Sequence, residues 1–379
     1  MIYLDHAAAT PINKEILKAY NSALISYFAN PSSAHGLGHA SLRTLENLDV
    51  RTLKLLKLNS NFEIIHVSGA TEANNLAIIG YATRNPHKGS EIWCLPSEHP
   101  STLNAMMHLR DKHSLKLISG ELNKNGQIDL ERLSEQLNED TLLVSVSLVN
   151  SEVGYLNDID AIVNLVRQKS HARIHVDLVQ GYGHVSLFDL NRVDFITLTL
   201  HKLGGPKTHG LLIKRKELLL DSLVYGGGQQ KNVRSGTEDL PGAIAMYKAL
   251  QLAQQGLKEN KEKIEEINWA LHNNFKKSEL IRINSTRDGS PYIFNMSLLK
   301  HKGSVVIEAL SNQEIYVSST SACSSRTNKG SKTLELVGES RQISENSIRL
   351  SFSYETTIEE ISAFTEAFNR VLGRIKQNG

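Results

Sequence analysis

Short apolar runs alternate with longer amphipathic stretches over the first two thirds of the chain. The apolar runs have the composition of strands buried on both faces and occupy residues 62–68, 91–95, 141–149, 173–177, 193–200 and 210–214. Amphipathic stretches between them, at 71–85, 101–112 and 158–170, favour helices. Alternation of strand and helix predicts an α/β fold with a mostly parallel sheet.

The pattern changes near residue 240, where a long helical tract begins and continues through the charged segment 258–275. Beyond it, the strand patterns IRINS, YIFNMSLL, IYVSS and SIRLSFS are mixed with two helical ones, SVVIEALSN and TTIEEISAFTEAFNRVLGRIK. This mixture is typical of a smaller α+β domain. We therefore expect a large domain of residues 13–245 and a small domain of residues 1–12 and 246–379, to which the N-terminal strand IYLDH returns.

Composition limits the partners that the chain can attract. It has 379 residues, 40% of them hydrophobic, which is enough to bury a large core. Its 42 Lys and Arg residues nearly balance 40 Asp and Glu residues, so the net charge is +2. No global field therefore draws in nucleic acid or a membrane, and partner choice must come from local patches.

The cysteines and the N-terminus favour a reducing compartment. Only Cys94 and Cys323 occur, too few for a disulfide framework in a chain of this length. The start, MIYLDHAAATP, has Asp5 in place of a basic region and no long apolar run, so it does not read as a signal peptide or a membrane span. We expect a cytoplasmic protein.

Lys202 is the first candidate for chemistry. It follows the apolar run 193–200 and precedes Gly204, Gly205 and Pro206, so a sharp turn should hold its amine near the carboxyl edge of the sheet, where ligands bind in such folds. A partly desolvated lysine can form a Schiff base with an aldehyde such as pyridoxal phosphate. Taken alone, the pattern also fits a solvated lysine in a surface loop.

The preceding strand pattern ends at Asp177, with Gln180 three residues later. A carboxylate there can keep a pyridine nitrogen protonated, which makes the ring an electron sink. Gln180 can donate to the ring's phenolate oxygen. By itself, Asp177 would equally suit a cap on the next turn. Its pairing with Lys202 on a neighbouring strand favours the cofactor role.

An anion site is indicated where the run 62–68 leads through Gly69, Ala70 and Thr71 into a helical pattern. Backbone N–H groups at a helix start attract phosphate, although a plain capped turn has the same pattern. Thr199 and His201 alternate with buried positions just before Lys202 and can add phosphate donors.

Two further residues have side chains suited to catalysis. His99 follows a strand pattern, where an imidazole can stack on a ring and move protons, although it is one of 15 histidines. Cys323 lies in the polar stretch SACSSRTNKGSK (321–332), which we expect to be a mobile loop with an accessible thiol. Cys94 lies within EIWCL and is expected in the core.

Over essentially its whole length the chain resembles the cysteine desulfurases of the class-V aminotransferase type. Each shared motif is short, but their common order is highly specific: YLDHAAATP, NPSSAHGLG, SGATEANN, SEH, VNSEVG, HVDLVQ, HKLGGPK, GGGQQKNVRSGTE, SSTSACSS and IRLSFS. The resemblance implies the fold type I of pyridoxal-phosphate-dependent transferases, with a seven-stranded sheet in the large domain and the catalytic cysteine loop on the small one.

The resemblance also implies the chemistry and the role of each residue. L-cysteine would be converted to L-alanine, and its sulfur would remain as a persulfide on Cys323 until a sulfur-acceptor protein took it, for iron–sulfur clusters, thio-cofactors or tRNA thiolation. The resemblance further implies that no metal and no nucleic acid would take part directly and that the enzyme would be a homodimer. The implied roles are Lys202 as Schiff-base lysine; Cys323 as nucleophile; His99 as stacking, proton-moving imidazole; Asp177 and Gln180 as ring partners; Ala70 (main chain), Thr71, Thr199 and His201 as phosphate ligands, with Thr237 from the second subunit; Asn150 as a ligand of cofactor and substrate; and Arg349 as the clamp of the substrate carboxylate.

Departures from the family pattern concern specificity. Thr199 stands for the more usual Ser, Ser151 for a second Asn, His39 for an Arg, and Thr320 for a Gly before SAC; GGGQQKN also lacks the usual acidic residue. Thr320 should stiffen the approach to Cys323. Two alternatives remain open: a selenocysteine lyase or related class-V enzyme, which would need Cys323 less, and a weakly active sulfur-relay scaffold.

Overall fold

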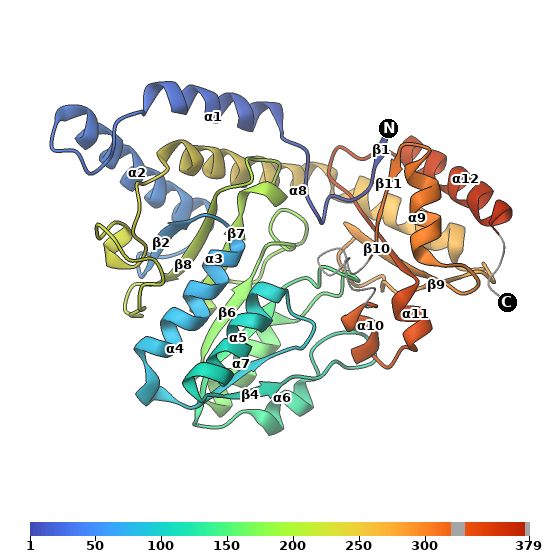
Figure 1. The fold of residues 1–379 in the computed structure, drawn as a ribbon, viewed down its shortest axis with the longest axis horizontal. Coiled ribbons are helices and arrows are strands. Elements are labelled where there is room, and N and C mark those ends of the chain that lie inside the picture. Colours follow the sequence, from blue (N-terminus) through green and yellow to red (C-terminus); the bar gives the residue numbers. More distant parts are fainter. Residues whose placement is uncertain (320–329, 376–379) are drawn as a thin grey trace.

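A seven-stranded sheet forms the centre of the larger part of the molecule (Figure 1). The computed structural model describes residues 1–319 and 330–375. Only β8 runs against the other strands of this sheet, which confirms the predicted mostly parallel arrangement. In spatial order the strands are β2 (Phe62–Val67), β8 (Gly210–Arg215), β7 (Phe195–Thr199), β6 (Arg173–Asp177), β5 (Thr141–Ser147), β3 (Glu91–Cys94) and β4 (Lys116–Ser119).

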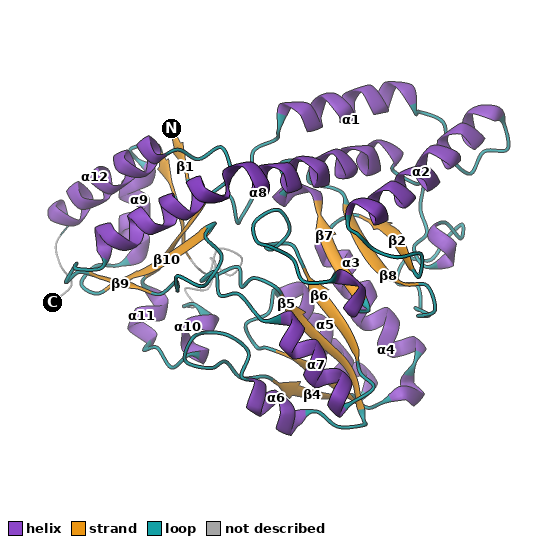
Figure 2. Cartoon of the chain, turned by 180° about the vertical axis from the view of Figure 1, so that it is seen from behind, coloured by secondary structure: helices purple, strands orange, loops and turns teal. Residues whose placement is uncertain are grey.

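Helices cover both faces of this sheet (Figure 2). Side chains of β3 show why: Trp93 packs into the core shared with α7 and α8, whereas Ile92 and Cys94 pack into the core shared with α3 and α5. The helices of the larger part are α1 (Lys14–Ser26), α2 (Gly36–Leu55), α3 (Ala70–Asn75), α4 (Tyr81–Arg84), α5 (Pro100–His113), α6 (Leu130–Gln136) and α7 (Ile159–Lys169), with a π-helical turn, η1 (Leu76–Gly80), between α3 and α4.

The smaller part has an antiparallel sheet and its own apolar core, which includes Leu4 near the N-terminus. Its strands in spatial order are β12 (Ser318–Ser319), β13 (Ser347–Ser351), β10 (Ile293–Leu298) and β9 (Ile281–Ile283). Beside them β1 (Ile2–Tyr3) pairs in parallel with β11 (Ile315–Tyr316). The helices are α9 (Gly303–Ser311), α10 (Lys332–Leu336), α11 (Arg341–Glu345) and α12 (Ile358–Arg374).

One long helix, α8 (Leu240–Phe275), runs from the larger part into the smaller one (Figure 1). Its apolar side chains pack into the core of the large sheet as far as Ala253 and into the core of the small sheet from Leu257 onward. Because the same helix serves both cores, it fixes the two sheets relative to each other. The division into domains at residue 245 remains a proposal.

The predicted strands of the large sheet lie within two residues of the observed ones, but β4 was not predicted. This edge strand is short and its side chains are partly exposed, so it lacks an apolar run. Also unpredicted is α1, which begins after Asn13, whose Oδ1 accepts the N–H groups of Glu15 and Ile16. Among the described residues, no helix combines the length and apolarity that crossing a membrane requires.

Candidate active site

Lys202 lies in a helical turn directly after β7, at the carboxyl edge of the large sheet. Its Nζ donates to the carbonyl oxygens of Ala7 at 2.5 Å and Ala8 at 2.6 Å. The chain turns back at once through Gly204, whose φ of +77° favours glycine. The amine is therefore held against the N-terminal segment instead of extending into a surface loop.

Asp177 ends β6, the strand beside β7. Its two carboxylate oxygens accept the Val179 N–H and the Asn74 side-chain amide, each at 2.9 Å. Gln180, in the following turn, donates its Nε2 to the same Ala7 oxygen that accepts from Lys202, at 2.9 Å. Lys202 and Gln180 therefore meet at one atom, and Asp177 lies at the end of the adjacent strand.

His99 is the N-cap of α5, and its Nδ1 lies 2.7 Å from Ser101 Oγ and 3.2 Å from the Ser101 backbone nitrogen. Burial lowers the pKa of His99, the Asp177 carboxylate acts in the opposite direction, and the Lys202 ammonium lowers the pKa further. The three groups thus lie within electrostatic reach of one another. The structure places His99, Asp177, Gln180 and Lys202 close together at this edge of the sheet.

The start of α3 has the features of an anion site. The first backbone hydrogen bond of the helix runs from Ala73 N–H to the Gly69 carbonyl, and glycine provides no side-chain cap. The N–H groups of Ala70, Thr71 and Glu72 precede that bond and are orphans of the helix start. Such a terminus favours a phosphate.

Thr199 and His201 lie beside this terminus. Thr199 Oγ1 is 3.7 Å from the position that a Cβ on Gly69 would take and 3.1 Å from His201 Nδ1. Burial, followed by the charge of Lys202, lowers the pKa of His201 to about 4. His201 is therefore neutral at pH 7, and it offers hydrogen bonds but no charge to an anion.

Glu72 ties the anion site to a segment far along the chain. Its carboxylate accepts the Ser68 N–H at 2.7 Å and the Arg234 Nε–H at 2.7 Å. Burial alone would raise the pKa of Glu72, but the hydrogen bonds from Arg234 and Ser68 bring it below its usual value. Arg234 is thereby fixed next to α3.

Arg349, on β13, reaches the site from the smaller part. Its guanidinium donates to the Ser151 carbonyl at 2.8 Å and to Asp5 Oδ1 at 2.9 Å. The side chain is buried, and its Nε has no hydrogen-bond partner in the described part of the chain. A buried, unused donor on a guanidinium suits a carboxylate ligand.

Asn150 lies beside this arginine but uses its amide within the protein. Its Nδ2 donates to Thr333 Oγ1 at 3.0 Å, and its Oδ1 accepts the N–H groups of Glu152 and Val153. Next to it, the partly buried Glu152 carboxylate accepts from Ser331 Oγ at 2.6 Å. Asn150 and Glu152 thus anchor the chain just after residues 320–329.

Two predicted site residues are not joined to this group. Thr237 lines a hollow of about 200 Å³ together with Ser68 and Thr208. Cys323 lies outside the described residues, as does most of the stretch 321–332 that we expect to be mobile. Cys94 is buried in β3, as predicted, and burial raises the pKa of its thiol.

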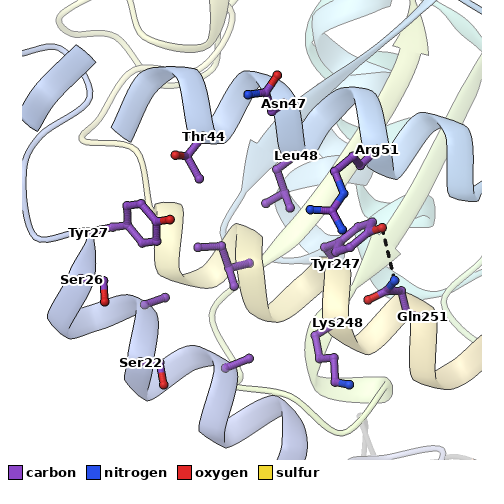
Figure 3. Close-up of a pocket in the computed structure, with 13 residues that line it drawn as sticks. Ser22, Ser26, Tyr27, Thr44, Asn47, Leu48, Arg51, Tyr247, Lys248 and Gln251 are labelled. Atoms are coloured by element: carbon purple, nitrogen blue, oxygen red, sulfur yellow. Dashed lines mark hydrogen bonds between the residues drawn. The ribbon is translucent and has the colours of Figure 1, made fainter. Parts of the chain in front are cut away.

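A larger hollow, of about 570 Å³, lies between α1, α2 and α8 (Figure 3). Tyr247, Lys248 and Gln251 of α8 face it, with Arg51 above the Tyr247 ring. None of the predicted site residues lines it, so size alone does not locate the candidate site. In the described ranges, no cluster of three or more His, Cys, Asp or Glu residues can hold a metal ion.

Glu98, directly before His99, is a residue to which the sequence assigned no role. Its Oε1 accepts the Ser147 N–H at 3.0 Å, and its Oε2 is buried without a partner among the described residues. Burial, reinforced by the nearby Asp177 carboxylate, raises the pKa of Glu98 to about 8. The SEH motif does not predict the raised pKa of Glu98, because burial depends on the tertiary structure.

Glu98→Gln is expected to make the folded protein less sensitive to pH. Between the ordinary pKa of glutamate and about 8, the folded chain keeps a proton that the unfolded chain loses, so stability falls as the pH rises. Wild type should lose unfolding free energy between pH 5 and pH 9 that the variant keeps. The free energy of unfolding of the variant minus that of wild type should therefore increase by about 1–4 kcal/mol from pH 5 to pH 9. Denaturant unfolding at both pH values measures this; exposed Glu139→Gln is the control, and equal changes in both variants would contradict it.

Comparison with known proteins gives consistent matches along the chain. The model of the family Aminotransferase class-V matches residues 2–364. A "NifS/IcsS protein homolog" of Lactobacillus delbrueckii is 33% identical over 98% of this chain and 97% of its own length. "Cysteine desulfurase IscS" of Dictyoglomus turgidum is 30% identical over 99% and 95%. A solved structure titled "NIFS-LIKE PROTEIN" covers 99% of this chain and 100% of its own, with a TM-score of 0.91 and 28% identity.

Proposed function

Because the chain belongs to the class-V aminotransferase family and is an enzyme of the cysteine desulfurase type, we propose that it converts L-cysteine to L-alanine with pyridoxal 5'-phosphate. The sulfur is kept as a persulfide on Cys323 and passed to an acceptor protein. The observation that carries this proposal is the placement of Lys202 and Asp177 at the ends of neighbouring parallel strands, an amine and a carboxylate at one sheet edge.

The residues present fit this cofactor. The uncapped start of α3 and the Thr199 and His201 side chains suit its phosphate. Asp177 suits the ring nitrogen, Gln180 the ring oxygen and His99 the ring face. When bound, the cofactor withdraws electrons from the substrate Cα, so that a nearby base can remove its proton.

Lys202 is the group that holds the cofactor and moves protons. In the structure its amine is bonded to the Ala7 and Ala8 carbonyls, so the N-terminal segment fixes where the nitrogen lies. Lys202 would hold the cofactor through this nitrogen, and as a free amine it would be the base that moves the proton of the substrate Cα.

Arg349 binds the substrate carboxylate in this proposal. Its Nη2 is held by Asp5 and its Nη1 by the Ser151 carbonyl, so the guanidinium plane is already oriented. The unused Nε–H adds a donor for the carboxylate. Asn150 contributes indirectly, by fixing the turn that carries Ser151.

Both ends of the segment that carries Cys323 are held near this arginine. Ser318 is paired directly with Arg349 across β12 and β13, and Ser331 and Thr333 bond to Glu152 and Asn150 beyond the segment. Cys323 is four positions beyond Ser319, a length that an extended chain spans in about 14 Å. The proposal requires the Cys323 thiol to reach, over this length of chain, a substrate bound at Arg349.

The sulfur step balances without an external oxidant. The Cys323 thiolate attacks the substrate sulfur, a new S–S bond forms and the Cβ–S bond breaks. Cβ takes up a proton with the bond electrons and becomes the methyl group of alanine, while the Cys323 sulfur is oxidised to the persulfide level. An acceptor thiol, or a reductant in an assay, then removes the outer sulfur.

We also propose that the enzyme is a cytoplasmic homodimer in which Thr237 reaches the phosphate of the partner subunit. Thr237 is exposed, so its side chain is accessible to a second subunit. Large apolar side chains at the end of α1 are exposed, including Ile25 at 79% and Phe28 at 76%. Such a patch suits a protein interface.

The direct test is turnover by the purified protein supplied with pyridoxal phosphate, L-cysteine and a dithiol. We expect alanine and sulfide in a 1:1 ratio, measured by amino-acid analysis and a sulfide-specific dye. L-selenocysteine in place of cysteine is the comparison. Turnover of selenocysteine alone would indicate a lyase of that class, and absence of either product would leave only a relay scaffold.

A further inference from the structure

A continuous chain of side-chain hydrogen bonds runs from Asp177 to His99. Asn74 Nδ2 donates one hydrogen to Asp177 Oδ2 at 2.9 Å and the other to Ser101 Oγ at 2.9 Å. Ser101 Oγ in turn lies 2.7 Å from His99 Nδ1. Asn74 is on α3 and Ser101 on α5, helices that pack against each other (Figure 1).

The direction of each hydrogen bond follows from the chemistry of the groups. An ionised carboxylate has only acceptor oxygens, so the atom of Asn74 that faces Asp177 must be its amide nitrogen. The opposite orientation would turn Oδ1 toward the carboxylate. The observed one leaves Oδ1 buried without a partner in the described chain, a cost that the two donated bonds offset.

The hydrogen bond from Asn74 helps to orient the Ser101 hydroxyl. Because Oγ accepts the Asn74 hydrogen, its own hydrogen is available for the 2.7 Å contact with His99 Nδ1. The Ser101 backbone N–H points at the same ring nitrogen, at 3.2 Å. A backbone N–H can only donate, so Nδ1 presents its lone pair to it, and the Ser101 hydroxyl is then the second donor to the same nitrogen.

We infer that Asn74 and Ser101 are positioning residues that hold the His99 ring neutral, with its proton on Nε2, so that His99 serves the site as a hydrogen-bond donor. A neutral imidazole can polarise a ligand oxygen in this way. To move a proton, His99 would first have to be protonated at Nδ1, and Ser101 would have to rotate away. This qualifies the proton-moving role that the family resemblance implies.

The groups around His99 agree with a neutral ring. Burial is the largest influence and lowers its pKa, Lys202 lowers it further, and only Asp177 acts in the opposite direction. The chain from Asp177 ends in donors at Nδ1, so the carboxylate favours the ring's orientation without supplying an acceptor to it. Use of this tautomer in catalysis rests on the proposed function, whereas the tautomer itself does not.

The test is the tautomer and titration of His99 in the full-length chain labelled with ¹⁵N-histidine, recorded with and without bound pyridoxal phosphate. Two-bond ¹H–¹⁵N spectra distinguish the two ring nitrogens, and His99→Gln assigns the signal. Wild type should carry its proton on Nε2. Ser101→Ala should populate the Nδ1–H form and raise the His99 pKa by about one unit.

Paired variants separate this role from a purely structural one. Asn74→Ala should act in the same direction as Ser101→Ala, and the double variant should add little, because the two residues act in series. Ser101→Thr, which keeps the hydroxyl, should restore the wild-type spectrum. Asn75→Ala is the matched control, since its amide touches only the backbone carbonyls of Thr71 and Ser101.

A wild-type proton on Nδ1, or unchanged spectra in both Ser101→Ala and Asn74→Ala, would overturn the inference. Should Ser101→Ala fail to fold, Asn74→Ala decides alone. The acid limb of the pH profile of cysteine turnover should shift toward higher pH in the same variants. If wild type shows the Nε2 proton but no turnover, the proposed function fails and the tautomer assignment stands.

Discussion

Lys202→Ala is expected to yield a folded, colourless protein that releases neither alanine nor sulfide from cysteine. The loss should be on the order of 10³-fold or more, since the residue that binds the cofactor and moves the proton is removed at once. Lys202 Nζ is bonded to the Ala7 and Ala8 carbonyls at the edge of the sheet, and no other described residue presents an amine in their place. Product analysis and visible absorbance measure the effect.

The matched control is Lys216→Ala, an exposed lysine just after β8. It should keep both colour and turnover. Far-ultraviolet circular dichroism of the two variants should coincide with wild type, which separates loss of chemistry from loss of fold. A coloured Lys202→Ala protein with wild-type turnover would remove the basis of the site assignment.

Cys323→Ala is expected to keep the cofactor and lose sulfur transfer. The described contacts of Lys202, Asp177 and the start of α3 are made by other residues, so binding of pyridoxal phosphate should be unchanged. Cysteine turnover should fall by on the order of 10²-fold or more, and no persulfide should form on the protein. Alkylation followed by mass spectrometry detects the persulfide.

Cys94→Ala provides the comparison, because Cys94 is the second cysteine and is buried in β3. It should still form the persulfide on Cys323. Full sulfide release by Cys323→Ala would show that the nucleophile is dispensable, as expected for a selenocysteine lyase and not for a desulfurase.

The pattern of hydrophobic residues predicted the strands of the large sheet, because those strands are buried on both faces and consist of continuous apolar runs. For the same reason β4 was not predicted: it is an edge strand with half-exposed side chains and therefore has no continuous apolar run. Helix α1 was not predicted either, because it starts at the polar cap Asn13 and leaves the apolar side chains of Leu24 and Ile25 exposed. Elements without a strong apolar signature need tertiary context to be recognised.

The site was predictable where a residue ends a strand, as Asp177 does, or follows one, as Lys202 and His99 do, because the ends of parallel strands lie at one edge of the sheet. Contacts made across long stretches of sequence were not predictable. Lys202 donates to the backbone carbonyls of Ala7 and Ala8, and no residue type in the sequence indicates that a carbonyl will accept such a bond. Likewise, Asn74 and Glu98 stood within noted motifs, but their partners are known only from the fold.

The central claim is that an aldehyde cofactor is bonded to the amine of Lys202. Reduction of the cofactor-loaded protein with borohydride, followed by proteolysis and peptide mass spectrometry, tests it most directly. The account predicts a single phosphopyridoxyl group, on the peptide that contains Lys202. A label on another lysine, or no label on a protein that binds the cofactor and turns over cysteine, would contradict it.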